Sequence, residues 1–512
     1  MSHRITRRRK ALAGTAAAGL AAALLSLTTP GATASNASSA AEPASTPVPI
    51  AAPDGTVMSY VLNARIANPG QTRQIERAVA EAGGVVVQSW PQIGVVVAHS
   101  DRSAFRDDVR SDAGKALESV GATRTVGVSE GTPDDVSASW GRGASGYKVG
   151  AKKDYNGDVG SEATTATTDD PREGEQWDMQ MIKADQAHDI TDGNRNVLVG
   201  VLDSGIDPDH PDLVANIDVA DSVNCTDAGR PDRSATGWYP TTSDHGTHVA
   251  GTIAAARNGI GITGVAPNVR MASVKVVNDA GFIYPEYAVC GFVWAGSHHM
   301  DVTNNSYYVD PFRYYCEDQP DQAAAKEAVR RAVAWSTEQG VVSSAAAGNE
   351  ADDLANKTTD TTSPDDSTPI TRTVNSGCHD IPTELDGVVT VASMQRFPAG
   401  TLDSRLSGFS NRGLGVIDVA APGSSILSTI VAGNGYGLKS GTSMASPHVA
   451  GVLALMKSAH PSWSPARMVR ELRAQADDKP CGTTTAGASC VGTPEDNSYF
   501  GEGVVDALDA VR

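Results

Sequence analysis

One short stretch decides how this chain is interpreted, and it reads Gly441-Thr442-Ser443-Met444-Ala445-Ser446-Pro447-His448-Val449-Ala450-Gly451. Gly441 permits a tight backbone that leaves the hydroxyl of Ser443 exposed. Pro447 suits the first turn of a helix, and the small apolar residues after it predict that this helix is buried. Backbone N–H groups at such a helix start can hold a developing oxyanion, although Ser443 taken alone is more typical of an N-cap than of a nucleophile.

Two other stretches supply the partners that a nucleophilic serine needs. A short apolar run that ends at Asp203 predicts a buried parallel strand with a carboxylate at its C-terminal edge, a plain Asp-Ser-Gly turn being the alternative. His245 stands at the start of a small apolar helix, and His248 three residues on leaves metal ligation as the alternative. Serine attack on an acyl carbon requires a base to take the proton and an acid to orient that base. Asp203, His245 and Ser443 provide these three groups.

The stretch from 341 to 350 predicts a strand that ends in Gly348 and Asn349. The side-chain amide of Asn349 is a candidate donor to the oxyanion of an acyl-transfer reaction. Asp203 and Asn349 both fall at the carboxyl ends of predicted strands, where catalytic groups gather in open α/β sheets. These residues therefore predict a single site at one edge of the sheet.

Together the four stretches resemble those of the subtilisin-like serine proteases, the subtilases. The resemblance covers residues 171–512 and rests mainly on the long HGTHVAG and GTSMASPHVAG motifs. It implies a catalytic triad of Asp203, His245 and Ser443, with an oxyanion hole formed by Asn349 and the backbone N–H of Ser443. It also implies a secreted bacterial enzyme with an inhibitory propeptide and no cofactor required for catalysis. Structural calcium is common in the family, but no loop here identifies calcium ligands, and no metal site is predicted.

The chain begins with two segments that lie outside any folded domain. Residues 1–34 combine a basic start, an apolar run and a small-residue cleavage site, which predict a signal peptide for the general or the twin-arginine export route. Residues 35–54 are rich in Ala, Ser, Pro and Thr and predict a flexible linker. A secreted protein without a stable membrane anchor is expected.

A small domain and a connector precede the catalytic part. Residues 55–130 predict an α+β domain with the order β-α-β-β-α-β, whose last strand lies near 120–128. It resembles the inhibitory propeptide of subtilases, and an independent binding domain is the alternative. Residues 131–170, which contain few large apolar side chains, predict a disordered connector that includes the activation cleavage site.

Apolar strands alternate with helices in the catalytic part. This alternation predicts an α/β fold with a mostly parallel, doubly wound sheet, which the resemblance identifies as the subtilisin type. The predicted strands are 197–202, 269–277, 302–305, 341–346, 388–392 and 416–420, and the predicted helices lie at 177–187, near His245, near Tyr287, at 323–339, near Ser446 and at 465–475.

Two stretches match the substrate-binding strands of the family. One contains Gly281, whose missing side chain lets a peptide backbone lie alongside. The other contains Ser306, Tyr307 and Tyr308, where the family usually has Ser-Leu-Gly. A tyrosine in place of the glycine is expected to reshape the pocket for the residue before the scissile bond. The acidic segment 351–366 nearby is interpreted as a solvated insertion, with a preference for basic substrates as the alternative.

Charge and cysteine content restrict the partners and the compartment. The net charge of −19 argues against nucleic acid as a partner, and protein or peptide substrates, the chain's own propeptide and a monomeric state are expected instead. Six cysteines in a secreted chain predict disulfides. Six cysteines allow fifteen disulfide connectivities. Cys481 and Cys490 would close a short loop and are the favoured pair, and Cys225–Cys290 with Cys316–Cys378 is one way to pair the other four.

The sequence therefore predicts a secreted serine endopeptidase that forms an acyl-enzyme and is made as a self-processing zymogen. Two alternatives stay open. One is a dedicated maturation protease for a specific leader peptide, which the altered Tyr307-Tyr308 strand keeps open. The other is an inactive binding protein on a protease fold. The presence of suitable residues at all four positions that the reaction needs argues against it.

Overall fold

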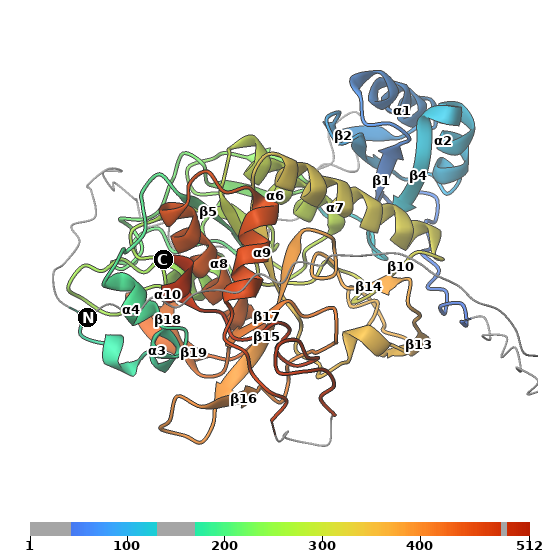
Figure 1. Ribbon diagram of the computed structural model, residues 1–512. Coiled ribbons are helices and arrows are strands. Elements are labelled where there is room, and N and C mark those ends of the chain that lie inside the picture. The colour runs from blue at the N-terminus through green and yellow to red at the C-terminus, as the bar shows by residue number, and fades with distance from the viewer. Residues whose placement is uncertain (1–41, 131–168, 483–488) are drawn as a thin grey trace, which may run out of the picture. The chain divides into compact units, whose positions relative to one another are not determined.

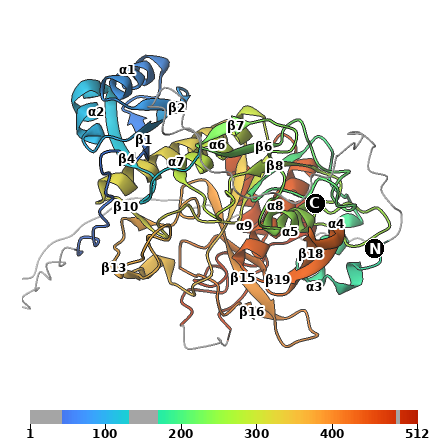
Figure 2. The same cartoon turned by 180° about the vertical axis from the view of Figure 1, so that it is seen from behind.

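The computed structural model describes residues 42–130, 169–482 and 489–512 (Figures 1 and 2). The predicted signal peptide and nearly all of the predicted connector lie outside these residues. The described residues from Pro43 onward form one compact unit. Among the described helices, none is both long and apolar enough to cross a membrane.

The first folded part has the predicted β-α-β-β-α-β order and a four-stranded antiparallel sheet in the order β2-β3-β1-β4. Helix α1 begins where Pro69 occupies the first turn and the side chain of Asn68 accepts a hydrogen bond from the N–H of Gln71 (2.9 Å). Ile75 and Val79 are fully buried on the face of α1 that covers the sheet. The elements are β1 (Met58–Ala64), α1 (Pro69–Glu81), β2 (Val85–Trp90), β3 (Val95–Ser100), α2 (Phe105–Ala113), the 3₁₀ turn η1 (Gly114–Ala116) and β4 (Leu117–Ala122).

Strand β4 ends at Ala122, earlier than the strand predicted near 120–128. The chain nevertheless stays hydrogen-bonded to the β1 side beyond Ala122, because Thr123 N–H donates to the carbonyl of Ser59 (3.0 Å) and Val128 N–H donates to the carbonyl of Val57 (2.8 Å). Between these bonds lies Arg124, whose side chain is buried.

The second half of the predicted flexible linker makes hydrogen bonds with the catalytic part. Ser45 N–H donates to the carboxylate of Asp318 (2.8 Å), and Thr46 N–H donates to the carbonyl of Thr373 (2.9 Å). Residues 43–46 therefore lie along the catalytic part, whereas Asp54 accepts a hydrogen bond from the N–H of Ser103 in the first folded part (2.8 Å).

The catalytic part is organised around one large sheet, with strand order β16-β15-β11-β9-β5-β8-β6-β7 and β17 paired with β15. The pairs β6–β7 and β15–β16 are antiparallel and the others are parallel. The predicted strands correspond to β5, β8, β9, β11, β15 and β17. The strands are β5 (Leu198–Asp203), β6 (Val223–Asp227), β7 (Arg230–Asp232), β8 (Arg270–Lys275), β9 (Val302–Asn305), β11 (Val342–Ala346), β15 (Val388–Arg396), β16 (Ser404–Leu406) and β17 (Val419–Pro422).

Helices cover both faces of this sheet, as a doubly wound fold requires. Helices α6 and α7 belong to one hydrophobic cluster, and α5 and α8 belong to another (Figures 1 and 2). The predicted helix at 177–187 is two short helices, because Lys183 adopts a left-handed conformation between them. The helices are α3 (Trp177–Met181), α4 (Ala184–His188), α5 (His245–Ala254), α6 (Pro285–Ser297), α7 (Pro320–Glu338), α8 (Thr442–Ala459), α9 (Pro465–Gln475) and α10 (Ala507–Ala510), with 3₁₀ turns η2 (Glu173–Glu175), η3 (Leu354–Asn356) and η4 (Ala432–Asn434).

Three small two-stranded sheets and three disulfides complete the described fold. The disulfides join Cys225 to Cys290, Cys316 to Cys378 and Cys481 to Cys490, the same pairs that the sequence analysis gave. The Cys316–Cys378 bond links the two strands of one small sheet. The small sheets pair β10 (Tyr315–Cys316) with β14 (Cys378–His379), β12 (Thr359–Asp360) with β13 (Arg372–Thr373), and β18 (Ile426–Ile430) with β19 (Gly435–Lys439).

Candidate active site

Asp203 and His245 form a hydrogen-bonded pair at the carboxyl edge of the sheet. Asp203 is the last residue of β5, and His245 is the first residue of α5. The Nδ1 atom of His245 lies 2.9 Å and 3.0 Å from the two carboxylate oxygens of Asp203. Since a carboxylate only accepts, Nδ1 carries the proton and Nε2 is left as the basic nitrogen. The Asp203 side chain is 2% exposed and the His245 side chain 30% exposed, so only the histidine is open to a substrate.

The protonation of His245 reflects two opposing effects. Burial lowers the pKa of His245, but the charge of Asp203 and the hydrogen bond that His245 donates to it outweigh burial, so that the net pKa lies above the ordinary value. His248 differs, because burial is the main effect there and lowers its pKa to about 4. The Nε2 atom of His248 donates to the carbonyls of Ile426 or Gly437, each 3.1 Å away. His248 is therefore a neutral structural residue in this fold.

Ser443 lies in the first turn of α8 and is bonded reciprocally to Ser306. The Ser443 hydroxyl donates to the Ser306 carbonyl (3.2 Å), and the Ser306 hydroxyl donates to the Ser443 carbonyl (2.9 Å). Helix α8 begins at Thr442, so Pro447 lies beyond the first turn, contrary to the prediction. Because proline has no N–H, the carbonyl four residues earlier, that of Ser443, is left without its helical donor, and Ser306 supplies a replacement. The local sequence thus ties the serine to a substrate-binding strand.

No hydrogen bond joins Ser443 to His245 among the described residues. The Ser443 hydroxyl is turned toward Ser306 instead. Catalytic hydrogen bonds in enzymes without substrate are often long and form only when substrate binds. The hydrogen bond between Ser443 and His245 is therefore expected to form only with a bound substrate.

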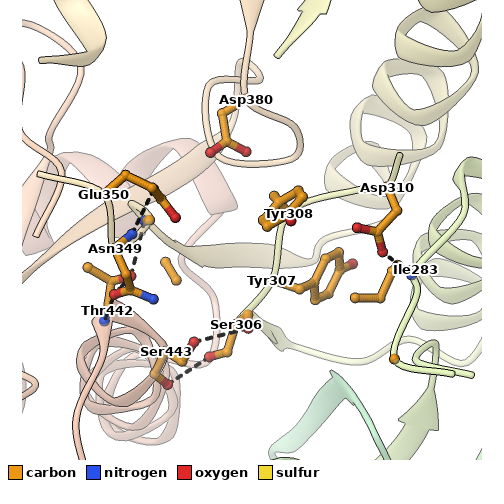
Figure 3. Close-up of a pocket in the computed structure, with 13 residues that line it drawn as sticks. Ile283, Ser306, Tyr307, Tyr308, Asp310, Asn349, Glu350, Asp380, Thr442 and Ser443 are labelled. Carbon is orange, nitrogen blue, oxygen red and sulfur yellow. Dashed lines mark hydrogen bonds between the residues drawn. The ribbon is translucent and has the colours of Figure 1, made fainter. Parts of the chain in front are cut away.

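Asn349 follows β11 and is held by the start of α8. Its Oδ1 atom accepts hydrogen bonds from the N–H of Thr442 (2.8 Å) and from the Thr442 hydroxyl (3.0 Å). With Oδ1 occupied in this way, the Nδ2 donor is turned to the side of Ser443 (Figure 3). Asn349 is therefore a preorganised donor beside the serine.

One pocket, with a volume of about 200 Å³, brings most of the predicted site residues together (Figure 3). Its walls include Ser443 and Asn349 and all four predicted substrate-binding residues. Asp203 and His245 are not among the residues that line it. The lining residues are Gly281, Ile283, Ser306, Tyr307, Tyr308, Asp310, Ala346, Gly348, Asn349, Glu350, Asp380, Thr442 and Ser443.

Sequence reasoning missed the acidic lining of this pocket. Glu350 directly follows Asn349, and Asp310 comes two residues after Tyr308, so their proximity to the motifs was an available signal. Asp380 lies in the loop between β14 and β15, and no motif surrounds it. Its position in the pocket depends on the tertiary fold alone.

The acidic segment 351–366 is not a simple solvated insertion, because several of its carboxylates are bonded to the protein. Asp352 accepts a hydrogen bond from the Tyr314 hydroxyl (2.8 Å). Asp360 is buried and paired with the buried Arg372 (2.7 Å). Asp365 accepts from the Tyr308 hydroxyl (2.8 Å), which connects the segment to the pocket wall.

Comparison with known proteins agrees with this geometry. The model of the subtilase family matches residues 194–503. The chain is 34% identical over 336 residues to subtilisin of Bacillus pumilus, covering 66% of this chain and 98% of that protein. It is 36% identical over 336 residues to subtilisin E of Bacillus subtilis (strain 168), covering 66% of this chain and 71% of that protein.

A solved structure shares the fold. The epidermin leader peptide processing serine protease of Staphylococcus aureus aligns with a TM-score of 0.60 at 20% identity, covering 89% of this chain and 98% of that chain. The fold and the family match define a serine endopeptidase with a subtilisin-like architecture. The chain belongs to the subtilase family, as the motifs predicted.

Proposed function

We propose that the protein is a secreted endopeptidase that cleaves peptide bonds with Ser443 as nucleophile, His245 as general base and Asp203 as the group that orients the imidazole. The observation that carries the proposal is the Asp203–His245 hydrogen bond at the edge of a sheet where Ser443 and Asn349 share one pocket. Three disulfides support an extracellular location.

The reaction follows from the positions of these groups. Nε2 of His245 takes the proton from Ser443 as the serine Oγ bonds to the substrate carbonyl carbon. Asn349 Nδ2 and the Ser443 N–H donate to the oxyanion that forms. His245 then gives its proton to the departing amine nitrogen, the C–N bond breaks, and an acyl-enzyme remains. Water attacks this ester, gives a proton to His245 and releases the acid, and Ser443 regains its proton.

We further propose that residues 55–130 are an inhibitory propeptide. Strand β4 lies against α7 (Figure 1), and the guanidinium of Arg106 pairs with Asp321 at the start of α7 (2.6 Å). A second anchor is Arg124, which is buried between Glu286 and the ring of Tyr284, 3.7 Å from the ring centroid. Helix α6 begins directly after the pocket residues Gly281 and Ile283, so this anchor places the end of the domain close to the cleft.

The test compares the full precursor with its Ser443→Ala variant by mass analysis of the secreted products. If only the wild type loses the segment before about residue 171 (to within a few residues), the result supports Ser443 as the nucleophile and the chain as a self-processing zymogen. Equal trimming of both proteins assigns processing to another protease, and a fluorophosphonate probe then tests Ser443 directly. Absence of trimming and of labelling favours the inactive binding protein.

A dedicated maturation protease is the second candidate function. The specific observation that favours it is that Tyr307 and Tyr308 both line the pocket, where the family usually presents smaller residues. A cleavage profile on a peptide library separates the two candidates, because a maturation protease accepts few sequences and a degradative enzyme accepts many.

A further inference from the structure

The pocket beside Ser443 contains a buried carboxylate that has no hydrogen-bond partner at one of its oxygens. Asp380 is only 2% exposed and lines the same pocket as Ser443 and Asn349. Its Oδ1 atom has no hydrogen-bond partner among the described residues. Figure 3 shows the carboxylate pointing into the space between Glu350 and Tyr308. A buried carboxylate left in this way is costly unless a cation or a donor approaches it.

The cations near Asp380 are paired with other carboxylates. The Nη2 atom of Arg313 lies 2.8 Å from Glu350 and 2.8 Å from Asp352. The ammonium of Lys357 lies 2.5 Å from Glu384. Neither cation forms an ion pair with Asp380 among the described residues.

The other two acids of the pocket are less available to a ligand. Asp310 already accepts a hydrogen bond from the N–H of Ile283. Glu350 uses Oε2 to accept from Arg313 and from the N–H of Asn349 (2.9 Å). Asp380 is therefore the acid best placed to receive a group that enters the pocket.

The aromatic wall suits a long alkyl stem with a polar end. Tyr308 donates its hydroxyl to Asp365 (2.8 Å), and Tyr307 donates its hydroxyl to Asn305 (3.1 Å). With both hydroxyls engaged, the rings are left as apolar surface along the pocket. Lysine and arginine side chains combine an apolar stem with a charged head, and such heads also interact favourably with aromatic rings.

We propose that this pocket receives the residue on the acyl side of the scissile bond, and that Asp380 selects lysine or arginine there. This proposal rests on the proposed function, because it requires Ser443 to attack the carbonyl that follows the bound side chain. A carboxylate at the base of the equivalent pocket is one way in which serine proteases select basic residues. Burial, with Glu384 and Glu350, raises the pKa of Asp380 well above its ordinary value, and an incoming cation opposes this shift by stabilising the charged form.

The experiment uses mature wild-type enzyme and the Asp380→Asn variant with fluorogenic peptides that differ only in having Arg, Lys or Leu before the scissile bond. Asp386→Asn is the matched control, because it removes the same charge from an exposed side chain outside the pocket. We expect the wild type to prefer Arg and Lys. A hydrogen bond to a charged group implies a loss of about 10- to 150-fold in kcat/KM for the basic peptides in Asp380→Asn, with Leu cleavage retained.

Several outcomes overturn the proposal. A wild type that cleaves Leu better than Arg refutes it while leaving the proposed function intact. If Asp380→Asn keeps the preference for Arg and Lys and Glu350→Gln loses it, then Glu350 and not Asp380 selects the basic residue. Equal losses for all three peptides show a structural role for Asp380. Absence of cleavage of every peptide, with no probe labelling of Ser443, refutes the proposed function and this proposal with it.

Discussion

Replacing Asn349 removes two interactions, one made by each end of its side-chain amide, and the loss of each can be measured separately. The Nδ2 atom is the proposed donor to the oxyanion, and Oδ1 accepts from the N–H of Thr442 at the start of α8. Loss of the equivalent donor in subtilisin, a member of this family, costs about 10²–10³-fold in kcat, or about 2.7–4 kcal/mol of transition-state stabilisation. Loss of a side-chain acceptor at a helix start costs about 1 kcal/mol of folding free energy.

Two substitutions distinguish these effects. In Asn349→Ala we expect kcat to fall by about 10²–10³-fold and the free energy of unfolding to fall by about 1 kcal/mol. In Asn349→Asp one carboxylate oxygen still accepts from Thr442, so stability is retained. The other oxygen faces the developing oxyanion as a negative charge, so kcat falls by at least about 10³-fold.

The assay measures kcat and KM on one peptide substrate, and urea unfolding in a Ser443→Ala background, where self-digestion is absent. KM is expected to change little, because the ground-state carbonyl gains less from this donor than the transition state does. Retention of kcat within tenfold in Asn349→Asp refutes the assignment of Nδ2 to the oxyanion. A loss of stability in Asn349→Asp as large as in Asn349→Ala refutes the assignment of Oδ1 to the helix start.

Two further predictions follow from the charges of the structure. Because the pKa of His245 is raised above its ordinary value, the base form appears only above that raised pKa, and kcat/KM should rise with pH through a midpoint above about 6.5. In Asp203→Asn the main effect that raises this pKa is lost while burial remains, so the midpoint should move below about 6.5 and kcat should fall by about 10⁴-fold. An unmoved midpoint contradicts the pairing. Arg124→Met leaves the fully buried Glu286 without its charged partner, so the inactive precursor should lose about 3–5 kcal/mol in urea unfolding. Glu118→Gln breaks a half-exposed ion pair between the same two parts and should cost at most about 1 kcal/mol, and equal effects of the two substitutions contradict a buried anchor.

Much of this protein was predictable from local sequence. The strand that ends at Asp203 forms where the sequence predicted it. The predicted strand before Asn349 forms as β11, which ends at Ala346, three residues earlier than predicted. The helix that carries Ser443 also forms. Apolar runs bounded by small polar residues determine such elements, because the side chains that must be buried are consecutive in the chain. The helix start was less predictable. Proline favours a first turn, but packing of Ser306 against the Ser443 carbonyl allowed the helix to begin five residues before Pro447.

The sequence by itself determined the family, the α/β order and the residue types available for acyl transfer, because each of these is written in contiguous motifs. Only the tertiary structure decided what surrounds them. The acidic segment 351–366 became bonded rather than solvated, since Tyr314, Arg372 and Tyr308 reach it from other parts of the chain. Asp380 came to the pocket from a loop with no motif, and its burial without a partner at Oδ1 depends on side chains remote in sequence. Charge in a pocket is a sum over such non-local neighbours, and therefore no single stretch of sequence predicts it.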